Sequence, residues 1–241
     1  MSRSNPNENN PNPSQRWYEW NGEKGLVRYY DKTTKKNVEV GTEFTFLWLD
    51  QLAGVGGWHK ASDSSIYSNA VKDIRSEVLV VKAHKEGIIA EGLYKDIKDR
   101  VNSVGGYYEA QCYIAYKTEA GALAIGCLRF KGASLNAWVE FSKANRDDLR
   151  SKAVRIVGFT EGTHGRVVYR VPTFATHPIS TITDAEAVAL DAKFQKWLSG
   201  YLKRTTSEQV EQGPPPQDDD SFPPTEDDYA AAAVSHEDRA W

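Results

Sequence analysis

The sequence predicts a mainly β protein of the α+β class, in which a partly closed five-stranded antiparallel barrel carries added strands and helices. About eight segments have the alternating or β-branched composition of strands, and about three have the spacing of helices. The strands follow one another as hairpins rather than as repeating βαβ units. One helix interrupts the strands, which then resume, and this order fits a Greek-key barrel with additions.

The first structured segment is rich in aromatic and basic residues. Residues 26–30 are predicted to form a strand, because aromatic and β-branched side chains fit a pleated surface. A basic turn at residues 32–36 leads into a long strand at residues 38–49. Residues 53–69 are expected to be a glycine-rich loop, ending in a short strand around Ile66.

The middle of the chain predicts a hairpin and a helix. Residues 77–83 and 87–91 are separated by a short turn, which is typical of a hairpin. Residues 93–104 have apolar positions at helical spacing, and two glycines follow them.

The clearest strand lies at residues 107–117. One side carries Tyr108, Ala110, Cys112, Ile114 and Tyr116, and the other, which is both polar and aromatic, carries Tyr107, Glu109, Gln111, Tyr113 and Lys117. A loop is expected between Pro172 and Pro178, and Thr183 is the expected N-cap of the last helix, with Glu186 at capping-box spacing. The remaining elements are predicted as strands at residues 122–131, 154–159 and 166–171 and as helices at residues 135–145 and 184–204.

Charge is distributed unevenly along the chain. Residues 205–241 contain ten acidic residues and one basic residue, a formal charge of −9 out of a total of −3, so residues 1–204 carry +6. A proline-punctuated segment this acidic buries too little apolar surface to fold alone, and it is expected to be disordered. Residues 1–15, rich in Asn, Pro and Ser, are expected to be disordered as well. The packed domain is therefore placed at residues 16–204.

Several classes of protein are disfavoured by missing motifs. There is no Walker-type phosphate loop, and Gly54-Val55-Gly56-Gly57 lacks the strand-to-helix context of a dinucleotide fingerprint. The histidines and cysteines lack zinc spacing. The adjacent pair Asp147-Asp148 is more typical of an exposed helix boundary than of a metal site. We therefore expect no enzyme activity, no cofactor and no metal.

Location is predicted from the cysteines and from hydropathy. Cys112 and Cys127 lie in apolar strands, and the chain shows no signal peptide and no apolar stretch long enough to cross a bilayer. Buried, reduced cysteines in a cytoplasmic protein are the expectation.

A basic, aromatic-rich β domain is suited to single-stranded nucleic acid, because cations contact phosphates while rings stack on bases. For any single aromatic residue, packing in the core is the competing interpretation. Strand alternation selects these candidate DNA contacts: Trp58, Lys60, Tyr67, Lys82, Tyr107, Tyr113, Arg129 and Lys131.

The acidic segment supplies a second set of candidates. Large aromatics in an acidic tail are typical of a peptide that docks in a basic, apolar pocket of a partner, although an inert solvated tail is the competing interpretation. The tail would also compete with DNA for the basic domain as a phosphate mimic. The candidate partner-binding residues are Asp218, Asp219, Asp220, Phe222 and Trp241.

The run Asp218–Pro224 and the terminal Trp241 carry a family resemblance. The chain resembles the single-stranded DNA-binding proteins of tailed bacteriophages, and its tail is similar to those of the bacterial proteins of this kind. The resemblance implies an OB-fold, no catalysis, protection of replication, recombination and repair intermediates, and recruitment of a polymerase, helicase or nuclease through the tail. In the bacterial proteins the acidic motif ends the chain, whereas here residues follow Pro224, so Phe222 and Trp241 are alternative docking residues.

Two other functions remain open from the sequence: a strand-annealing recombination protein and a metal-dependent nuclease whose carboxylates meet only in the fold. An oligomer is also compatible with the sequence.

Overall fold

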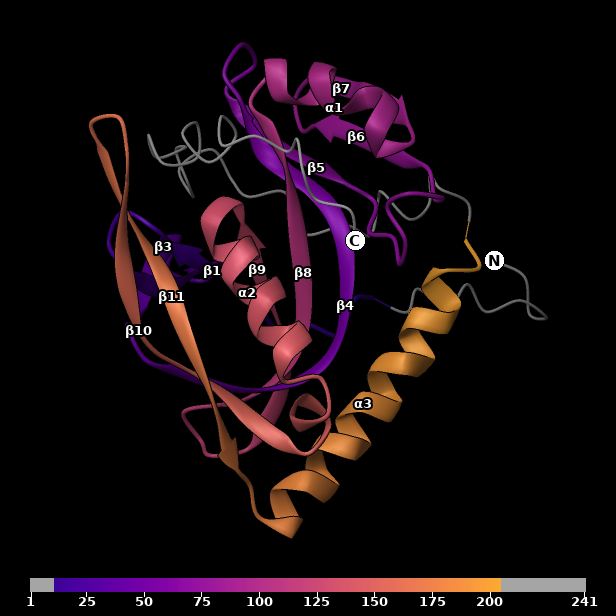
Figure 1. The fold of residues 1–241 in the computed structure, drawn as a ribbon. Coiled ribbons are helices and arrows are strands. Elements are labelled where there is room, and N and C mark those ends of the chain that lie inside the picture. Colours follow the sequence, from indigo (N-terminus) through magenta and orange to yellow (C-terminus); the bar gives the residue numbers. More distant parts are fainter. Residues whose placement is uncertain (1–10, 205–241) are drawn as a thin grey trace, which may run out of the picture.

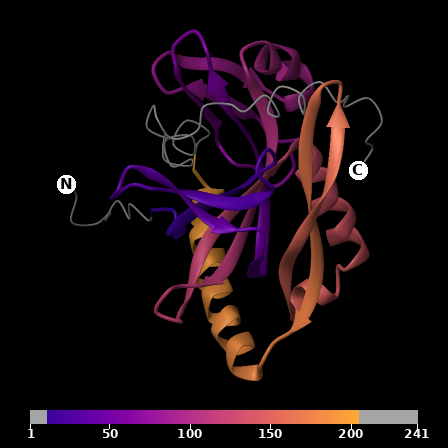
Figure 2. The ribbon, with the colours of Figure 1, turned by 90° about the vertical axis from the view of Figure 1, so that its left-hand side faces the viewer.

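The computed structural model describes residues 11–204, which form one large sheet with helices on both faces (Figures 1 and 2). The strands are β1 (Arg16–Asn21), β2 (Leu26–Asp31), β3 (Lys36–Gly41), β4 (Phe44–His59), β5 (Ser64–Ser68), β6 (Leu79–Ala83), β7 (Gly87–Gly92), β8 (Gly106–Lys117), β9 (Leu123–Lys131), β10 (Lys152–His164) and β11 (Val167–Pro178). The helices are α1 (Tyr94–Ser103), α2 (Gly132–Ala144) and α3 (Thr181–Tyr201), with a 3-10 turn, η1, at Asp148–Arg150.

The mainly β fold class is confirmed, but the five-stranded antiparallel barrel is wrong. The sheet has eleven strands in the order β3-β2-β1-β9-β8-β4-β5-β6-β7, with β10 pairing with β4 and β11, and it does not close. It is also mixed, because β1 runs parallel to β9, with Arg16 beside Gly126. Local sequence patterns do not specify a pairing between segments so far apart in the chain, and this pairing converts a row of hairpins into a broad open sheet.

The N-terminal boundary lies earlier than residue 16. The backbone N–H of Gln15 donates to the carbonyl of Ile125 at 2.8 Å, and Asn12 Nδ2 donates to the Tyr113 hydroxyl at 3.0 Å. Part of the expected N-terminal tail is thus hydrogen-bonded to the sheet.

The glycine-rich stretch expected to be a loop is the second half of a strand. β4 continues to His59 and pairs with β8 along its length, so the turn begins only after this residue. The short strand around Ile66 is confirmed as β5. The loop expected after Pro172 is also strand, because β11 continues to Pro178. Proline is tolerated there because, among the described residues, β11 pairs only with β10 and needs no N–H donors on its other side.

Helix positions agree with the predictions to within a few residues. α3 begins at Thr181, and its N-cap is Ser180 rather than Thr183: the Ser180 Oγ accepts from the Thr183 N–H at 3.1 Å. The other two helices each begin or end within three residues of the expected positions.

One face of the sheet carries most of the apolar core. α2 lies in the concavity between β8 and the β10–β11 hairpin (Figure 1), where Trp138 is fully buried and stacks on Phe130 with centroids 5.4 Å apart. The hairpin leans back toward β1, whose Trp20 Nε1 donates to the Arg170 carbonyl at 2.8 Å. α1 covers the same face at the other end of β8, with Ile97 and Val101 in the adjoining cluster.

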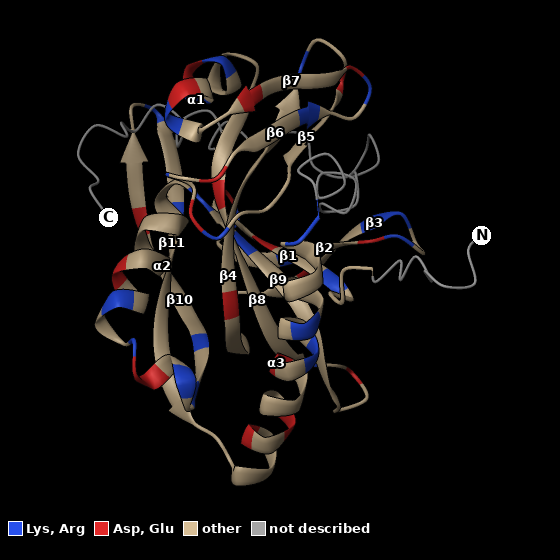
Figure 3. Cartoon of the chain, turned by 90° about the vertical axis from the view of Figure 1, so that its right-hand side faces the viewer, with Lys and Arg blue, Asp and Glu red and all other residues tan. Residues whose placement is uncertain are grey.

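The opposite face is covered by α3 over only part of its area. Phe194 and Trp197 of α3 pack on the buried Tyr113, with ring centroids 4.3 and 5.8 Å away. The Tyr201 hydroxyl accepts from the Ala70 N–H at 2.7 Å. α3 is therefore fixed across one half of this face (Figure 3).

The two cysteines, Cys112 and Cys127, are buried and free, as predicted. Of the helices in residues 11–204, none combines the length and the apolar character that crossing a membrane requires.

Candidate functional site

A polar strip begins on the sheet face where α3 ends. On four strands, the residue packed under α3 is apolar or aromatic and the next residue on the same face is polar or glycine. The pairs are Trp17 and Glu19 on β1, Cys127 and Arg129 on β9, Tyr113 and Gln111 on β8, and Leu52 and Gly54 on β4.

Cross-strand register extends this strip over seven strands, from β2 to β6. Residues directly opposite each other on neighbouring strands share a face of the sheet. The pairing partner of a strip residue on the next strand therefore also belongs to the strip. We define the polar strip as Arg28, Glu19, Arg129, Lys131, Gln111, Glu109, Tyr107, Tyr67 and Lys82, together with Gly54 and Gly56.

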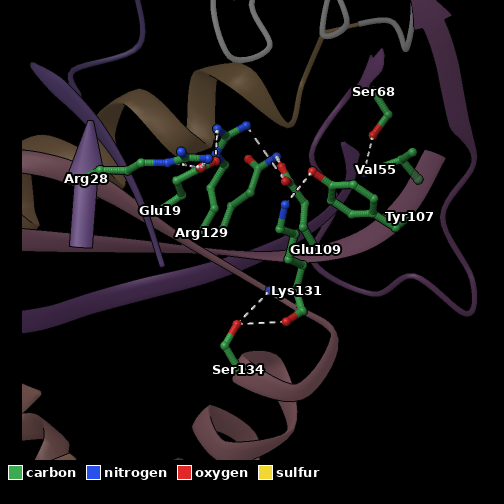
Figure 4. A network of polar contacts seen from close by, with 10 residues as sticks. Glu19, Arg28, Val55, Ser68, Tyr107, Glu109, Arg129, Lys131 and Ser134 are labelled. Carbon is green, nitrogen blue, oxygen red and sulfur yellow. Dashed lines mark hydrogen bonds and ion pairs between the residues drawn. The ribbon is translucent and has the colours of Figure 1, made fainter. Parts of the chain in front are cut away.

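Two carboxylates and two guanidinium groups alternate across the strip (Figure 4). The Arg28 Nε donates to Glu19 Oε1 at 2.7 Å, and Arg129 Nη2 donates to the other oxygen of Glu19 at 3.3 Å. Arg129 Nη1 lies 3.8 Å from Glu109 Oε2, and Gln111 Nε2 donates to Glu109 Oε1 at 3.0 Å. Charges of opposite sign therefore follow one another from β2 to β8.

These ion pairs are largely removed from water. The side chains of Glu19, Glu109 and Arg129 are 8%, 2% and 11% exposed. Burial by itself lowers the pKa of Arg129, but the carboxylates of Glu109 and Glu19 outweigh it and raise that pKa above its ordinary value. Arg129 is thus a charged interior residue, and its charge is balanced within the protein.

Two glycines of β4 make room for this network. A Cβ at Gly56 would lie 2.5 Å from Glu109 Oε2, and one at Gly54 would lie 2.8 Å from Gln111 Nε2. The side chains of Glu109 and Gln111 therefore extend over the backbone of β4, which explains why a strand carries glycines at alternate positions.

The network is not fully satisfied by protein groups. In the described part of the chain, Gln111 Oε1 and Arg129 Nε are buried without hydrogen-bond partners. An unpaired buried polar atom costs about 1–3 kcal/mol. A water or a ligand that donates to the amide oxygen and accepts from the guanidinium would recover part of this free energy.

Aromatic rings and cations meet in the part of the strip between β9 and β6. Lys131 Nζ donates to the Tyr107 hydroxyl at 3.2 Å and lies 4.7 Å from the ring centroid. Tyr107 and Tyr67 lie on either side of Gly56, and Lys82 is opposite Tyr67 on β6. All four side chains belong to half-buried residues on one face of the sheet.

Five of the eight predicted DNA contacts, including Arg129 in its ion pairs, thus lie in one strip. The other three lie elsewhere. Tyr113 shares the face but is 1% exposed beneath α3, so it is a packing residue. Trp58 is 8% exposed, and Lys60 is exposed in the turn after β4. The predicted partner-binding residues Asp218, Asp219, Asp220, Phe222 and Trp241 lie outside the described residues.

Besides the two glycines, four members of the strip were not predicted as site residues. Glu109 and Gln111 follow from the alternation of residues 107–117, whose second side is polar. Glu19 and Arg28 join only through the parallel pairing of β1 with β9, which no local signal specifies.

The adjacent carboxylates Asp147 and Asp148 serve a local contact. Asp148 Oδ2 accepts from Lys152 Nζ at 2.9 Å, and this hydrogen bond holds the pKa of Asp148 below its ordinary value. Within residues 11–204, no three His, Cys, Asp or Glu side chains are grouped as metal ligands.

Substituting Gly56→Ala tests the packing of the strip. The new methyl group would displace the Glu109 carboxylate, so we expect the free energy of unfolding to fall by about 1–3 kcal/mol. Gly200→Ala in α3 is the matched control, because a Cβ there meets no atom within 4 Å. It should raise the free energy of unfolding by about 0.5–1 kcal/mol. Urea denaturation followed by circular dichroism measures both, and equal effects would contradict the packing described.

Substituting Arg129→Met tests the ion pairs. The change leaves two buried carboxylates without their shared cation, and we expect a loss of about 3–5 kcal/mol in unfolding free energy. Arg155→Met removes an exposed ion pair with Glu43 and should cost about 0–1 kcal/mol. Denaturant titration of the two variants compares them, and a loss below about 1 kcal/mol for Arg129→Met would show that the strip does not depend on this residue.

Comparisons with family models, with curated proteins and with solved structures found no match to this chain.

Proposed function

We propose that this protein binds single-stranded DNA without sequence preference and acts as a binding protein rather than an enzyme. The observation that carries the proposal is the arrangement of Tyr107, Lys131, Tyr67 and Lys82, in which rings and cations from four strands share one sheet face.

This arrangement supplies the two interactions that unpaired nucleic acid requires. Stacking of a base on an aromatic ring contributes roughly 1–3 kcal/mol and does not depend on sequence, because every base has a π face. Lysines contact phosphates and displace counterions. The strip holds four cations, Arg28, Arg129, Lys131 and Lys82, against the carboxylates Glu19 and Glu109, so it remains net positive.

The length of the strip suits a short stretch of extended single-stranded DNA. Seven neighbouring strands at about 4.8 Å spacing span roughly 29 Å. The buried ion pairs around Arg129 would hold the strands in register, while the half-buried rings and lysines of the strip would contact the DNA.

We also propose that the curled part of the sheet is related to an OB-fold. The support is the approach of the β10–β11 hairpin to the turn after β1, where the Arg170 N–H donates to the Gly22 carbonyl at 2.8 Å. This contact brings the two ends of the curl together without a continuous strand ladder.

The acidic segment is proposed to compete with DNA and to recruit a replication or recombination protein through Asp218, Asp219, Asp220 and either Phe222 or Trp241. The support is the charge of −9 in residues 205–241 opposite +6 in the rest of the chain. A bacteriophage protein that works in the host cytoplasm is the setting this proposal implies.

Quenching of tryptophan fluorescence by oligo-dT tests the binding site. Tyr107→Ala should weaken binding by roughly 5–150-fold if one stacked base is lost. Lys131→Gln should reduce the salt dependence of log K by about one contact. Lys95→Gln on α1, which packs on the opposite face, is the control and should bind as the wild type does. Unchanged binding in both strip variants would contradict the site, and magnesium-dependent cleavage of the oligonucleotide would favour a nuclease.

Deleting residues 205–241 tests the competition. Removing the anionic segment should tighten oligo-dT binding, and the gain should shrink as salt is added because screening weakens charge interactions. The titration is repeated at low and high salt for both chains. A deletion that leaves affinity unchanged at low salt would show that the segment does not compete.

A further inference from the structure

The hairpin formed by β2 and β3 lies at the edge of the sheet, and β2 carries the outermost residue of the polar strip, Arg28. Among the described strands, β3 pairs only with β2, so residues 26–41 form a two-stranded arm at the edge of the sheet (Figure 3). Four of the six residues of β3 are exposed. We call residues 26–41 the arm.

One face of the arm continues the face of the polar strip. Arg28 belongs to the strip through its register with Glu19 on β1. Tyr30 lies two residues farther along the same strand and therefore on the same face, and Lys32 follows at the turn. This order of a cation, a ring and a second cation repeats the composition of the strip between β9 and β6.

The tip of the arm is held in a defined turn. Asp31 Oδ1 accepts from the Thr33 N–H at 2.9 Å, and Oδ2 accepts from the Thr34 hydroxyl at 2.8 Å. These bonds lower the pKa of Asp31 and keep it charged. Lys35 takes a positive φ of 53°, which closes the turn. The tip is thus structured without burying its side chains.

Cations gather at this tip. Lys32, Lys35 and Lys36 are all exposed, and none forms an ion pair with another described residue. At the base of the arm, by contrast, Lys24 Nζ pairs with Glu39 at 2.6 Å. Positive charge without an internal carboxylate partner is therefore concentrated at the end farthest from the strip, as expected for a surface that meets phosphates.

We propose that the arm is a second contact for the same DNA strand. A DNA strand that leaves the polar strip at Arg28 would stack a base on Tyr30 and place its phosphates against Lys32 and Lys35. The inference rests on the proposed function and adds to it that the binding site does not end at Arg28. From position 28 to position 32 the chain spans about 13 Å. That length holds at most about four further nucleotides at roughly 3.4 Å per nucleotide.

The test is a series of oligo-dT lengths titrated against the full chain. The arm variant carries Lys32→Gln, Lys35→Gln and Lys36→Gln. The matched control carries Lys95→Gln, Lys98→Gln and Arg100→Gln on α1, which removes the same number of charges from the opposite face. A separate Tyr30→Ala variant tests stacking, and circular dichroism checks that each variant is folded.

For short oligonucleotides that fill only the strip, we expect the arm variant to bind as the wild type does. For oligonucleotides about four nucleotides longer, it should bind roughly tenfold or more weakly. The salt dependence of log K should fall by about 1.4, since the phosphate contacts at Lys32 and Lys35 each contribute about 0.7 on a single strand. The α1 control should match the wild type at every length.

Other outcomes would overturn the inference. A loss of equal size at all lengths would show that the lysines act through the overall charge, and no loss at any length would show that the arm does not contact DNA. If the wild type binds no oligonucleotide at low salt, the proposed function itself fails, and the arm proposal fails with it.

Discussion

The placement of Arg129 between two buried carboxylates is the interaction on which the polar strip depends. Its guanidinium joins Glu19 on β1 to Glu109 on β8, so it ties the N-terminal strands to the centre of the sheet. Replacing a whole set of buried ion-pair partners by apolar residues of similar size often leaves stability unchanged. Removing only one partner lowers stability, because it leaves a buried charge unpaired. Here the set also holds two strands in the register that aligns the rings and lysines.

α3 and the glycines of β4 also determine where the polar side chains of the strip lie. α3 covers the half of the face where side chains are apolar, and its end defines where polar side chains begin. Gly54 and Gly56 let Glu109 and Gln111 lie across the neighbouring strand. One half of this face is therefore apolar and covered by α3. The other half carries a buried row of ion pairs and half-buried tyrosines and lysines.

Local sequence patterns predicted much of the secondary structure but little of its assembly. The alternation of residues 107–117 predicted both the strand and its polar side, and helical spacing placed all three helices. Glycines at positions 54, 56 and 57 suggested a loop because glycine usually marks turns. In the structure Gly54 and Gly56 make room for the side chains of Gln111 and Glu109 on β8, and Gly57 allows close approach of the backbone at Gly105 and Gly106. Members of the polar strip were predicted only where strand alternation alone identifies them. Tyr107 and Lys131 were predicted in this way, and Glu19 was not.

The parallel neighbours β1 and β9 impose an order on assembly. Residue 16 is made early in synthesis, yet its partner, residue 126, emerges more than a hundred residues later. Pairing over such a separation carries a large loop-closure entropy and slows folding. The first strands of this chain must therefore wait, unpaired on one side, until the meander of β4, β8 and β9 offers them an edge.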